Sequence, residues 1–489
     1  MTSFPTSTFQ RAATAFNGGD IRTAESLCQE LLKTASKTPQ VWVLLSRIRT
    51  RQARWPEAEE ALRTAQRLAP RDPEVLFSLA ILRIRQGRVA EAIPLLETAR
   101  SIAPSHVGIR CALASSFVDL GEPKKALAAI GTPTSADTHF AAALAHVALR
   151  DDAAAEPSLK AVIASGQNAA ATYQAHQHLG QILERRGDYA GAFASFKGAR
   201  AVVPLRYDIS ALHDEVRRLM DVFSDARVAS LARGTSESRR PVFIAGMPRS
   251  GTTLLEKMIA SHAKGAGAGE TDALRRQVDA WMTAAPPTPR WPETIAALGP
   301  AQLDATAQAY LTQTEVFAGP GIERIADKHL RNWLFVGLIA LAFPKATIVH
   351  IRRDPFDTGI SCFERLHPQS LPWSASIVHI GEALALNERL MAHWHRVFPG
   401  RILEVRYEEL AREPARVLPP VIEALGLPWD DACLRQHERK SRPGAQEPPP
   451  TFSADQVKRP VYDSSIGRAE RFGALLDPMR EAYARVAKG

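Results

Sequence analysis

Residues 241–262 read PVFIAGMPRSGTTLLEKMIASH, and this stretch decides the fold of the second half of the chain. Its apolar start, 241–245, predicts a short strand, 246–251 a glycine-containing loop, and 252–262 a helix with apolar residues at helical spacing. A strand, a loop and a helix in this order bring backbone N–H groups and the positive end of a helix to one point. The stretch therefore predicts an α/β domain that binds phosphate or a similar anion.

The loop departs from the common nucleotide-binding P-loop at one position. Gly246 and Gly251 have the P-loop spacing, but Thr252 stands where the P-loop lysine would follow the second glycine. The missing lysine argues against hydrolysis of ATP or GTP. Arg249 remains as the basic residue of the loop.

A second segment, 346–366, reads ATIVHIRRDPFDTGISCFERL and predicts a strand to Ile351, a turn and a helix. Arg353 leaves the carboxyl end of this strand, and Ser361 follows eight residues later in the helix. Ligands of open α/β sheets bind at the carboxyl ends of strands, and guanidinium groups bind phosphate with two hydrogen bonds. An arginine with a helical serine at this edge predicts a second phosphate site; the neighbouring Arg352 is an alternative to Arg353.

The first two hundred residues repeat with a period of 34. Blocks that start at 39, 73, 107 and 173 share small residues, such as Ala80, Ala92 and Ala99 of the second block. The blocks at 73, 107 and 173 have a glycine at the fifteenth position, and those at 39, 73 and 173 have a proline at the thirty-second. These offsets resemble the tetratricopeptide repeat, in which paired helices stack into a superhelix with a concave groove. The resemblance implies a domain that binds a protein or peptide, or mediates self-association; a generic alanine-rich helical bundle is the alternative.

We therefore predict an all-α tetratricopeptide-repeat superhelix followed by a P-loop-like α/β domain with a parallel sheet. The expected boundaries are 1–206 for the repeats, 207–240 for a helical linker that ends in a polar run, and 241–489 for the α/β domain.

The string PRSGTTLLE at 248–256 resembles the 5′-phosphosulfate loop of sulfotransferases that use 3′-phosphoadenosine-5′-phosphosulfate (PAPS), tyrosylprotein sulfotransferases among them. The R-D-x6-S pattern from Arg353 to Ser361 is similar to the 3′-phosphate element of the same family. The resemblance implies that PAPS is held by Arg249, Ser250, Gly251, Thr252 and Thr253 at one end and by Arg353 and Ser361 at the other.

Transfer of a sulfuryl group needs a base for the acceptor proton and cations for the sulfonate and bridging oxygens. Glu270, in GAGAGETDALRR (265–276), lies in what we expect to be a glycine-rich loop, and the resemblance implies that it is the general base. Its alternatives are a residue that complements a helix dipole and a base at His262. Lys328, which follows an apolar strand at 322–326, corresponds to a family lysine near the sulfonate.

Two later segments add candidates. RILEVRYEELAREP (401–414) predicts a strand and a helix, and the resemblance implies that Tyr407 lies near the nucleotide. FSADQVKRPVYDSSIGRAERF (452–472) resembles the loop that closes over PAPS, with Ser453 near the transferred group and Arg468 near the 3′-phosphate. Either segment is alternatively a surface loop.

The expected activity is PAPS-dependent transfer of a sulfuryl group to an acceptor hydroxyl of a tyrosine, a carbohydrate or a small molecule. The rival functions are a P-loop-type kinase and a nucleotide-binding scaffold whose repeats hold a protein partner.

The composition narrows the partners further. A net charge of +9 over 489 residues favours anionic partners, of which we expect a nucleotide and not nucleic acid. The four cysteines lie far apart without a CxxC pair, so we expect free thiols, no structural zinc and no other metal. We see no signal-peptide core at the start, and the longest apolar run, 333–343, is too short to cross a bilayer. We therefore expect a soluble, cytoplasmic protein.

Overall fold

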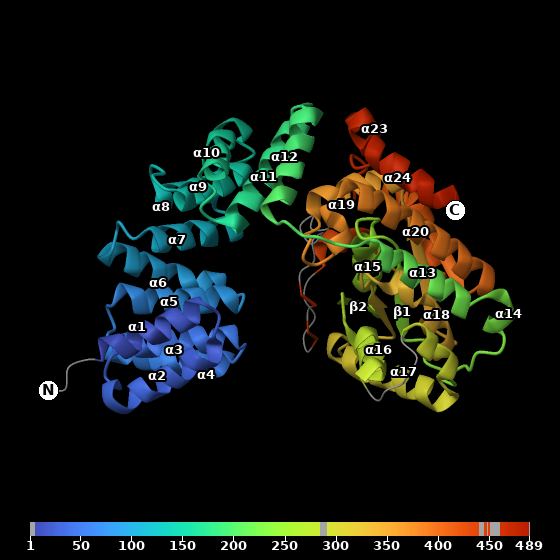
Figure 1. Ribbon diagram of the computed structural model, residues 1–489, viewed down its shortest axis with the longest axis horizontal. Helices are drawn as coiled ribbons and strands as arrows, with labels where there is room; N and C mark the ends of the chain where they lie inside the picture. Colours follow the sequence, from blue (N-terminus) through green and yellow to red (C-terminus); the bar gives the residue numbers. More distant parts are fainter. Residues whose placement is uncertain (1–4, 284–290, 440–444, 447, 450–459, 489) are drawn as a thin grey trace. The chain divides into compact units, whose positions relative to one another are not determined.

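The computed structural model describes residues 5–283, 291–439, 445–446, 448–449 and 460–488. The chain divides into two compact units, Met1–Val202 and Val203–Gly489 (Figure 1). No helix among the described residues is long and apolar enough to cross a membrane.

The first unit is a series of helices that pack in consecutive pairs, as Figure 1 shows in blue to green. The described helices are α1 (Thr6–Asn17), α2 (Ile21–Ala35), α3 (Pro39–Arg51), α4 (Trp55–Leu68), α5 (Pro73–Arg85), α6 (Val89–Ile102), α7 (Val107–Asp119), α8 (Pro123–Ile130), α9 (Ala136–Leu149), α10 (Asp152–Ser165), α11 (Ala169–Arg185) and α12 (Tyr189–Val202). Both the pairing and the stacking in chain order are those of tetratricopeptide repeats.

Small residues and glycines make this packing feasible. Ala80, Ala92 and Ala99 have no exposed surface. At Gly180 a Cβ atom would lie 2.4 Å from the ring of Phe196, so α11 and α12 approach as closely as they do only because Gly180 has no side chain. The glycine expected between paired helices has a positive φ, for example +76° at Gly87, a conformation that glycine adopts without strain.

The second unit contains a sheet that, in the described residues, has the strand order β2-β3-β1-β4-β5 with all neighbours parallel. The strands are β1 (Pro241–Ala245), β2 (Gly265–Gly269), β3 (Arg324–Asp327), β4 (Thr347–Arg352) and β5 (Ile402–Arg406). The predicted parallel sheet is therefore confirmed. Because every strand runs in the same direction, all five carboxyl ends meet at one edge.

Helices cover both faces of this sheet. On one face, Val242 and Ile244 of β1 share a buried cluster with residues of α15 (Thr252–Ser261), α21 (Tyr407–Arg412) and α22 (Pro414–Ala424). On the other face, Phe243 packs its ring against Tyr310 of α17 (Pro300–Thr314) and Phe343, with centroids 5.1 and 5.2 Å apart. There α18 (Asn332–Ala342) joins α20 (Ile377–Val397), since the indole of Trp394 donates to the carbonyl of Trp333 over 2.9 Å.

The other described helices are shorter or more peripheral. The α-helices are α13 (Ser210–Val222), α14 (Asp225–Val228), α16 (Ala273–Thr283), α19 (Pro355–Arg365), α23 (Arg468–Phe472) and α24 (Asp477–Lys488). The 3-10 turns are η1 (Glu293–Ala297), η2 (Glu315–Phe317), η3 (Pro372–Ala375), η4 (Asp431–Glu438) and η5 (Gly473–Leu476). Residues 207–240, which we expected as a helical linker, carry α13 and α14 and lie in the second unit, where α13 packs on α20.

The segment before Glu270 is not the loop that its glycines led us to expect. Residues 265–269 form strand β2, paired with β3. A Cβ atom at Gly265 would lie 2.1 Å from the carbonyl oxygen of Ile259, and one at Gly267 would lie 2.5 Å from the carboxylate of Glu256. The glycines let α15 press directly on the strand, so they report close packing and not an irregular loop.

Candidate active site

Each strand of the sheet is followed at its carboxyl end by a residue that the sequence singled out. The loop with Arg249 follows β1, Glu270 follows β2, Lys328 follows β3, Arg353 comes one residue after β4, and Tyr407 follows β5. Residues spread over nearly 160 positions of sequence are thereby gathered at one edge of one sheet, where open α/β folds bind ligands.

The loop after β1 is built to approach an anion closely. A Cβ atom at Gly246 would lie 2.6 Å from the carbonyl oxygen of Ile351, and one at Gly251 would lie 2.5 Å from the ring of Tyr407. Gly251 has φ +104° and leads into the first turn of α15. Ser250 donates its hydroxyl to the carbonyl of Met247 over 2.7 Å, which holds the turn closed. The free N–H groups of a helix start then point to the mouth of the loop.

Thr252 and Thr253, the first residues of α15, are both buried at this point. Thr252 therefore occupies the place of the P-loop lysine with a short hydroxyl and no charge.

Arg249 is the buried cation of the loop. It has a positive φ of 74°, unusual for a residue with a side chain, and its guanidinium donates from Nε to the hydroxyl of Ser361 over 3.1 Å. Burial, together with the nearby cation Arg365, lowers the pKa of Arg249 to about 10. The contact joins the two motifs that the sequence presented separately.

Arg353, and not Arg352, faces the loop. Its guanidinium donates to the carbonyl oxygens of Arg249 (3.0 Å) and Ser465 (2.6 Å). The same group lies over the ring of Tyr407, 4.6 Å from its centroid, a cation–π contact. Arg352 instead points to Glu404, with 3.4 Å between Nη1 and Oε1. The structure therefore separates two arginines that the sequence left as alternatives.

Glu364, a residue of α19, forms ion pairs with two arginines of this region. Its carboxylate pairs with Arg468 over 2.7 Å and with Arg365 over 2.7 Å. Burial acts to raise the pKa of Glu364, but Arg468, Arg365 and Arg249 outweigh it and lower the pKa to about 2. Glu364 thus serves as the resident anion of a cationic pocket.

Asp357 fastens the C-terminal segment to the same helix. Its carboxylate accepts from the backbone N–H groups of Gly467 (2.8 Å) and Ala469 (2.7 Å), at the start of α23. Arg468 lies between these two residues and is buried, so the described part of the predicted closing loop docks on α19. Ser453 lies outside the described residues.

Lys328 and Glu270 form an ion pair across the ends of β3 and β2. Gly269 and Asp327 are paired in register, and the backbone N–H of Lys328 donates to the carbonyl of Gly269 over 3.0 Å. The Lys328 side chain is 1% exposed and that of Glu270 is 26% exposed. The Glu270 carboxylate therefore has access to solvent, whereas the Lys328 ammonium group that pairs with it is buried.

Two buried carboxylates support this pair. Glu256 of α15 accepts from the backbone N–H of Gly269 over 2.8 Å, and Asp327 accepts from the hydroxyl of Tyr310 over 2.9 Å. Burial raises the pKa of both carboxyl groups. These contacts fix the ends of β2 and β3, and with them the backbone that carries Glu270 and Lys328.

His262, the rival base, has a structural role. Its Nε2 lies 2.8 Å from the carbonyl of Pro428 and its Nδ1 accepts from the backbone N–H of Lys264 over 2.9 Å. It follows the C-terminal end of α15, and the candidate site lies at the other end of that helix.

Three residues of the site, Glu364, Arg365 and Asp357, are not among those that the sequence singled out. Arg365 had a usable signal, because it lies one helical turn after Ser361 and therefore on the same face of α19. Glu364 and Asp357 had none, since an acidic residue beside an expected phosphate site looks unfavourable until the arginines that it pairs with are in place.

Taken together, the edge offers a helix start with a buried arginine, a second cationic group around Ser361, and a carboxylate beside a lysine. The first two can hold the two ends of a bisphosphate-like ligand. The third can exchange a proton with a hydroxyl group next to a cation.

Comparison with known proteins agrees with this chemistry. Residues 241–431 match the model of the sulfotransferase family, and residues 9–73, 43–107 and 140–204 match the tetratricopeptide repeat. The chain thus contains a domain of the sulfotransferase family at residues 241–431, together with tetratricopeptide repeats. The resemblance seen in the sequence is confirmed at this level.

Several relatives are similar over part of the chain. An uncharacterized protein of Aquifex aeolicus is 32% identical over 312 residues, which cover 62% of this chain and 40% of that protein. Protein-tyrosine sulfotransferase 1 of Danio rerio is 25% identical over 46% of this chain and 64% of its own length. The protein-tyrosine sulfotransferase of Drosophila melanogaster is 23% identical over 45% of each chain. The chain spans less than two thirds of the length of each of these relatives.

Among solved structures, the sulfotransferase domain from the Synechococcus PCC 7002 olefin synthase aligns over 52% of this chain and 98% of that domain, with 19% identity and a TM-score of 0.34. PilW, a type IV pilus biogenesis factor, aligns over 41% of this chain and 94% of its own, with 17% identity and a TM-score of 0.37.

Proposed function

We propose that this protein transfers the sulfuryl group of PAPS to an acceptor hydroxyl. The observation that carries the proposal is the buried contact between Arg249 and Ser361, which joins the loop after β1 to the helix after β4. A cation held there, between a helix start and a group of arginines, suits a ligand with an anion at each end.

The residues fit the two anionic ends of PAPS. Ser250, Gly251, Thr252 and Thr253 would hold the 5′-phosphosulfate at the start of α15. Arg353 and Ser361, with Arg468 from the C-terminal segment and Arg365 from the same helix, would hold the 3′-phosphate. Tyr407, beneath the guanidinium of Arg353, would support that arginine from the nucleotide side of the pocket.

Glu364 is the residue that this proposal must accommodate, because a carboxylate in a phosphate pocket repels the ligand. One oxygen of its carboxylate pairs with Arg468 and the other pairs with Arg365. The arginines thus remain oriented and charge-compensated before the nucleotide arrives, and binding only has to shift them toward the phosphate. Preorganised cations of this kind cost less to recruit than flexible ones.

Bound PAPS supplies the sulfuryl group and a leaving group, adenosine 3′,5′-bisphosphate. Glu270, which directly follows β2, has a partly exposed carboxylate. It would accept the proton of the acceptor hydroxyl as the oxygen attacks sulfur in line. Lys328 and Arg249 would stabilise the charge that develops on the sulfonate and bridging oxygens. Loss of the proton to Glu270 would release Lys328 from its ion pair at the moment when its charge is needed.

The acceptor is a hydroxyl compound, and the tyrosine sulfotransferases among the relatives make a tyrosine-containing peptide the first choice. The repeats would hold such a protein or peptide in the groove of the superhelix. Carbohydrates and small hydroxylated molecules are the other classes to test.

Calorimetric titration with adenosine 3′,5′-bisphosphate tests the donor site. A separate titration with Mg²⁺-ATP tests the rival function, a P-loop kinase. Incubation with sulfur-labelled PAPS and a panel of tyrosine peptides, oligosaccharides and phenols tests transfer. We expect binding of the bisphosphate and labelling of one acceptor class. Binding of Mg²⁺-ATP without the bisphosphate would refute the proposal in favour of a kinase. Binding of the bisphosphate without transfer to any acceptor class would favour a nucleotide-binding scaffold, and binding of neither ligand would also refute the proposal.

A further inference from the structure

A second group of polar side chains lies on the opposite side of β4 from α15. His350 of β4, Glu404 of β5 and His395 of α20 each offer a ligand atom, and these atoms all lie within 4.8 Å of one another. The sequence led us to expect no metal, and no local spacing pointed to this group. The three residues are spread over 55 positions, and only the sheet and the helix above it bring them together.

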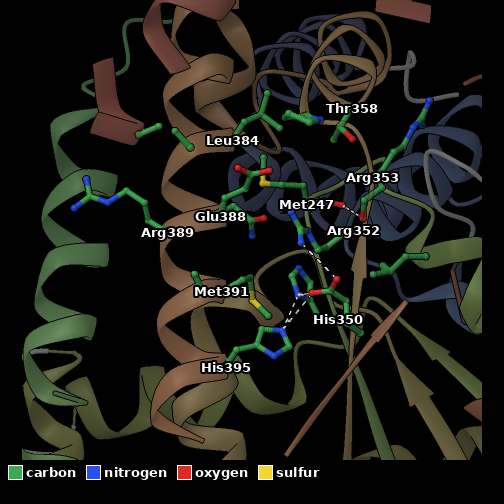
Figure 2. Close-up of a pocket in the computed structure, with 18 residues that line it drawn as sticks. Met247, His350, Arg352, Arg353, Thr358, Leu384, Glu388, Arg389, Met391 and His395 are labelled. Atoms are coloured by element: carbon green, nitrogen blue, oxygen red, sulfur yellow. Dashed lines mark hydrogen bonds and ion pairs between the residues drawn. The ribbon is translucent and has the colours of Figure 1, made fainter. Parts of the chain in front are cut away.

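The geometry of the cluster follows from the sheet. His350 and Glu404 are direct partners in the parallel register of β4 and β5, so their side chains leave the same face side by side. α20 crosses this face and places His395 above them. Figure 2 shows the rings of His350 and His395 turned toward each other from the strand and the helix.

The distances are those of a metal site that needs only a small adjustment. Nδ1 of His350 and Nε2 of His395 are 3.1 Å apart, and both lie 3.9 Å from Oε2 of Glu404. Ligand atoms at about 2.0 Å from a tetrahedral ion are about 3.3 Å apart. The two imidazole nitrogens are already close to this spacing. The carboxylate oxygen, now 3.9 Å from each nitrogen, would have to move closer to both of them.

The chemistry of the donors agrees with the geometry. His350 is buried, with 5% of its surface exposed, and its Nδ1 faces Nε2 of His395. A neutral imidazole has a lone pair available for a metal. The other oxygen of Glu404, Oε1, accepts a hydrogen bond from Arg352. This contact fixes the orientation of the carboxylate and leaves Oε2 for the ion.

We propose that His350, His395 and Glu404 bind a divalent transition-metal ion of the Zn²⁺ class. Two imidazoles and one carboxylate form a set that zinc takes when it keeps a fourth position open. All three residues line a cavity of about 340 Å³ that also borders Met247 and Ser250 of the phosphate loop. The open position would face this cavity and take a water molecule or an anionic oxygen.

The site also has a mechanical consequence. Among the strands that the structure describes, β5 is at the edge of the sheet and pairs with β4 alone. An ion shared by β4, β5 and α20 would cross-link that edge to its neighbour and to the covering helix. Bound metal should therefore stabilise the second unit.

The competing explanation is a hydrogen bond between two neutral histidines, with Glu404 paired only to Arg352. The 3.1 Å separation of the two ring nitrogens also suits an N–H donor and a nitrogen acceptor. A measurement with metal separates the two.

The experiment uses the tag-free full chain, stripped with a chelator and titrated with ZnCl₂ by calorimetry. His395→Gln and Glu404→Gln test the ligands, since both side chains are partly exposed and tolerate replacement better than His350. His379→Gln is the matched control, a histidine of α20 outside the cluster. We expect one Zn²⁺ per chain, an affinity lowered by about 100-fold or more in both ligand variants, and a change below about twofold in the control.

X-ray absorption of the zinc-loaded wild type gives a second, variant-independent measurement. Imidazole scattering and a zinc shell of nitrogen and oxygen atoms would support the site. Sulfur atoms in that shell would place the ion on a cysteine and overturn the proposal. The proposal is equally overturned if the wild type takes up no zinc, or if both ligand variants bind it as tightly as the wild type does.

Discussion

The guanidinium of Arg249 donates to the hydroxyl of Ser361 over 3.1 Å, although the two residues are 112 positions apart. One leaves β1 and the other lies in the helix after β4, and β1 and β4 are neighbours in the sheet. The contact brings the loop after β1 and the helix after β4 together at one site.

Glu270→Gln should abolish most of the transfer activity. Because Gln keeps the shape but cannot accept the acceptor proton, we expect turnover to fall by about 100-fold or more. Affinity for adenosine 3′,5′-bisphosphate should change little, because Glu270 lies at the end of β2, away from the proposed phosphate contacts. Turnover with labelled PAPS and calorimetry with the bisphosphate measure the two effects.

Glu323→Gln is the matched control for that change. Glu323 pairs with Lys264 over 2.6 Å near the opposite ends of the same two strands, where both side chains are exposed. It should retain wild-type turnover, because an exposed ion pair contributes little. Full activity in Glu270→Gln would remove this residue as the base.

Arg353→Ala should weaken nucleotide binding, whereas Arg352→Ala should not. Arg353 faces the loop and lies over Tyr407, and Arg352 points to Glu404. Loss of a charged hydrogen-bond donor costs about 1.5–3 kcal/mol, or about 10- to 150-fold in affinity for adenosine 3′,5′-bisphosphate.

Arg353→Lys refines the test, because it keeps the charge and loses the planar fork. An intermediate affinity is expected. If Arg352→Ala weakens binding more than Arg353→Ala does, the assignment of the 3′-phosphate contact is wrong.

Glu364→Gln should change how stability depends on pH. The pKa of Glu364 is about 2 in the folded chain, against an ordinary value of 4.5. A carboxyl group with a lowered pKa contributes stability that is complete above about pH 4.5 and is lost as the pH falls toward 2. Over that window the wild type should lose about 3 kcal/mol of unfolding free energy that the variant does not lose.

Denaturant midpoints measured from pH 7 to pH 2.5 check this expectation. At neutral pH the variant should be the less stable protein, because Arg468 and Arg365 lose their carboxylate partner. Parallel pH profiles for the two proteins would contradict the role of Glu364 as resident anion.

Gly251→Ala should disturb the phosphate loop through two separate effects. A side chain at φ +104° is strained, and its Cβ atom would lie 2.5 Å from the ring of Tyr407. Gly400→Ala is the control, because Gly400 has φ +72° with no atom within 4 Å of the added Cβ. The control should cost about 1–2 kcal/mol from strain alone.

Gly251→Ala should cost more than the control in a denaturant titration, and it should also weaken binding of adenosine 3′,5′-bisphosphate. Equal stability losses in the two variants would show that Tyr407 moves aside without cost.

The sequence by itself determined the two kinds of domain and singled out most of the residues that the structure gathers at one edge of the sheet. The repeat offsets gave the helix pairs, because close helix packing demands small residues at fixed positions. The strand-loop-helix at 241–262 and the segments around Lys328, Arg353 and Tyr407 predicted the parallel sheet and the edge that carries the candidate residues, since each predicted strand ends within a few residues of its candidate. These features are local, and local spacing records them.

Only the tertiary structure decided what depends on contacts between distant segments. It made β2 from a run of glycines that pack under α15, separated Arg353 from Arg352, and showed Glu364 among the arginines. It also joined His350, His395 and Glu404 into one cluster. The physical reason is the same in each case: the environment that defines the role comes from strands and helices far away in the chain, and no local spacing encodes it.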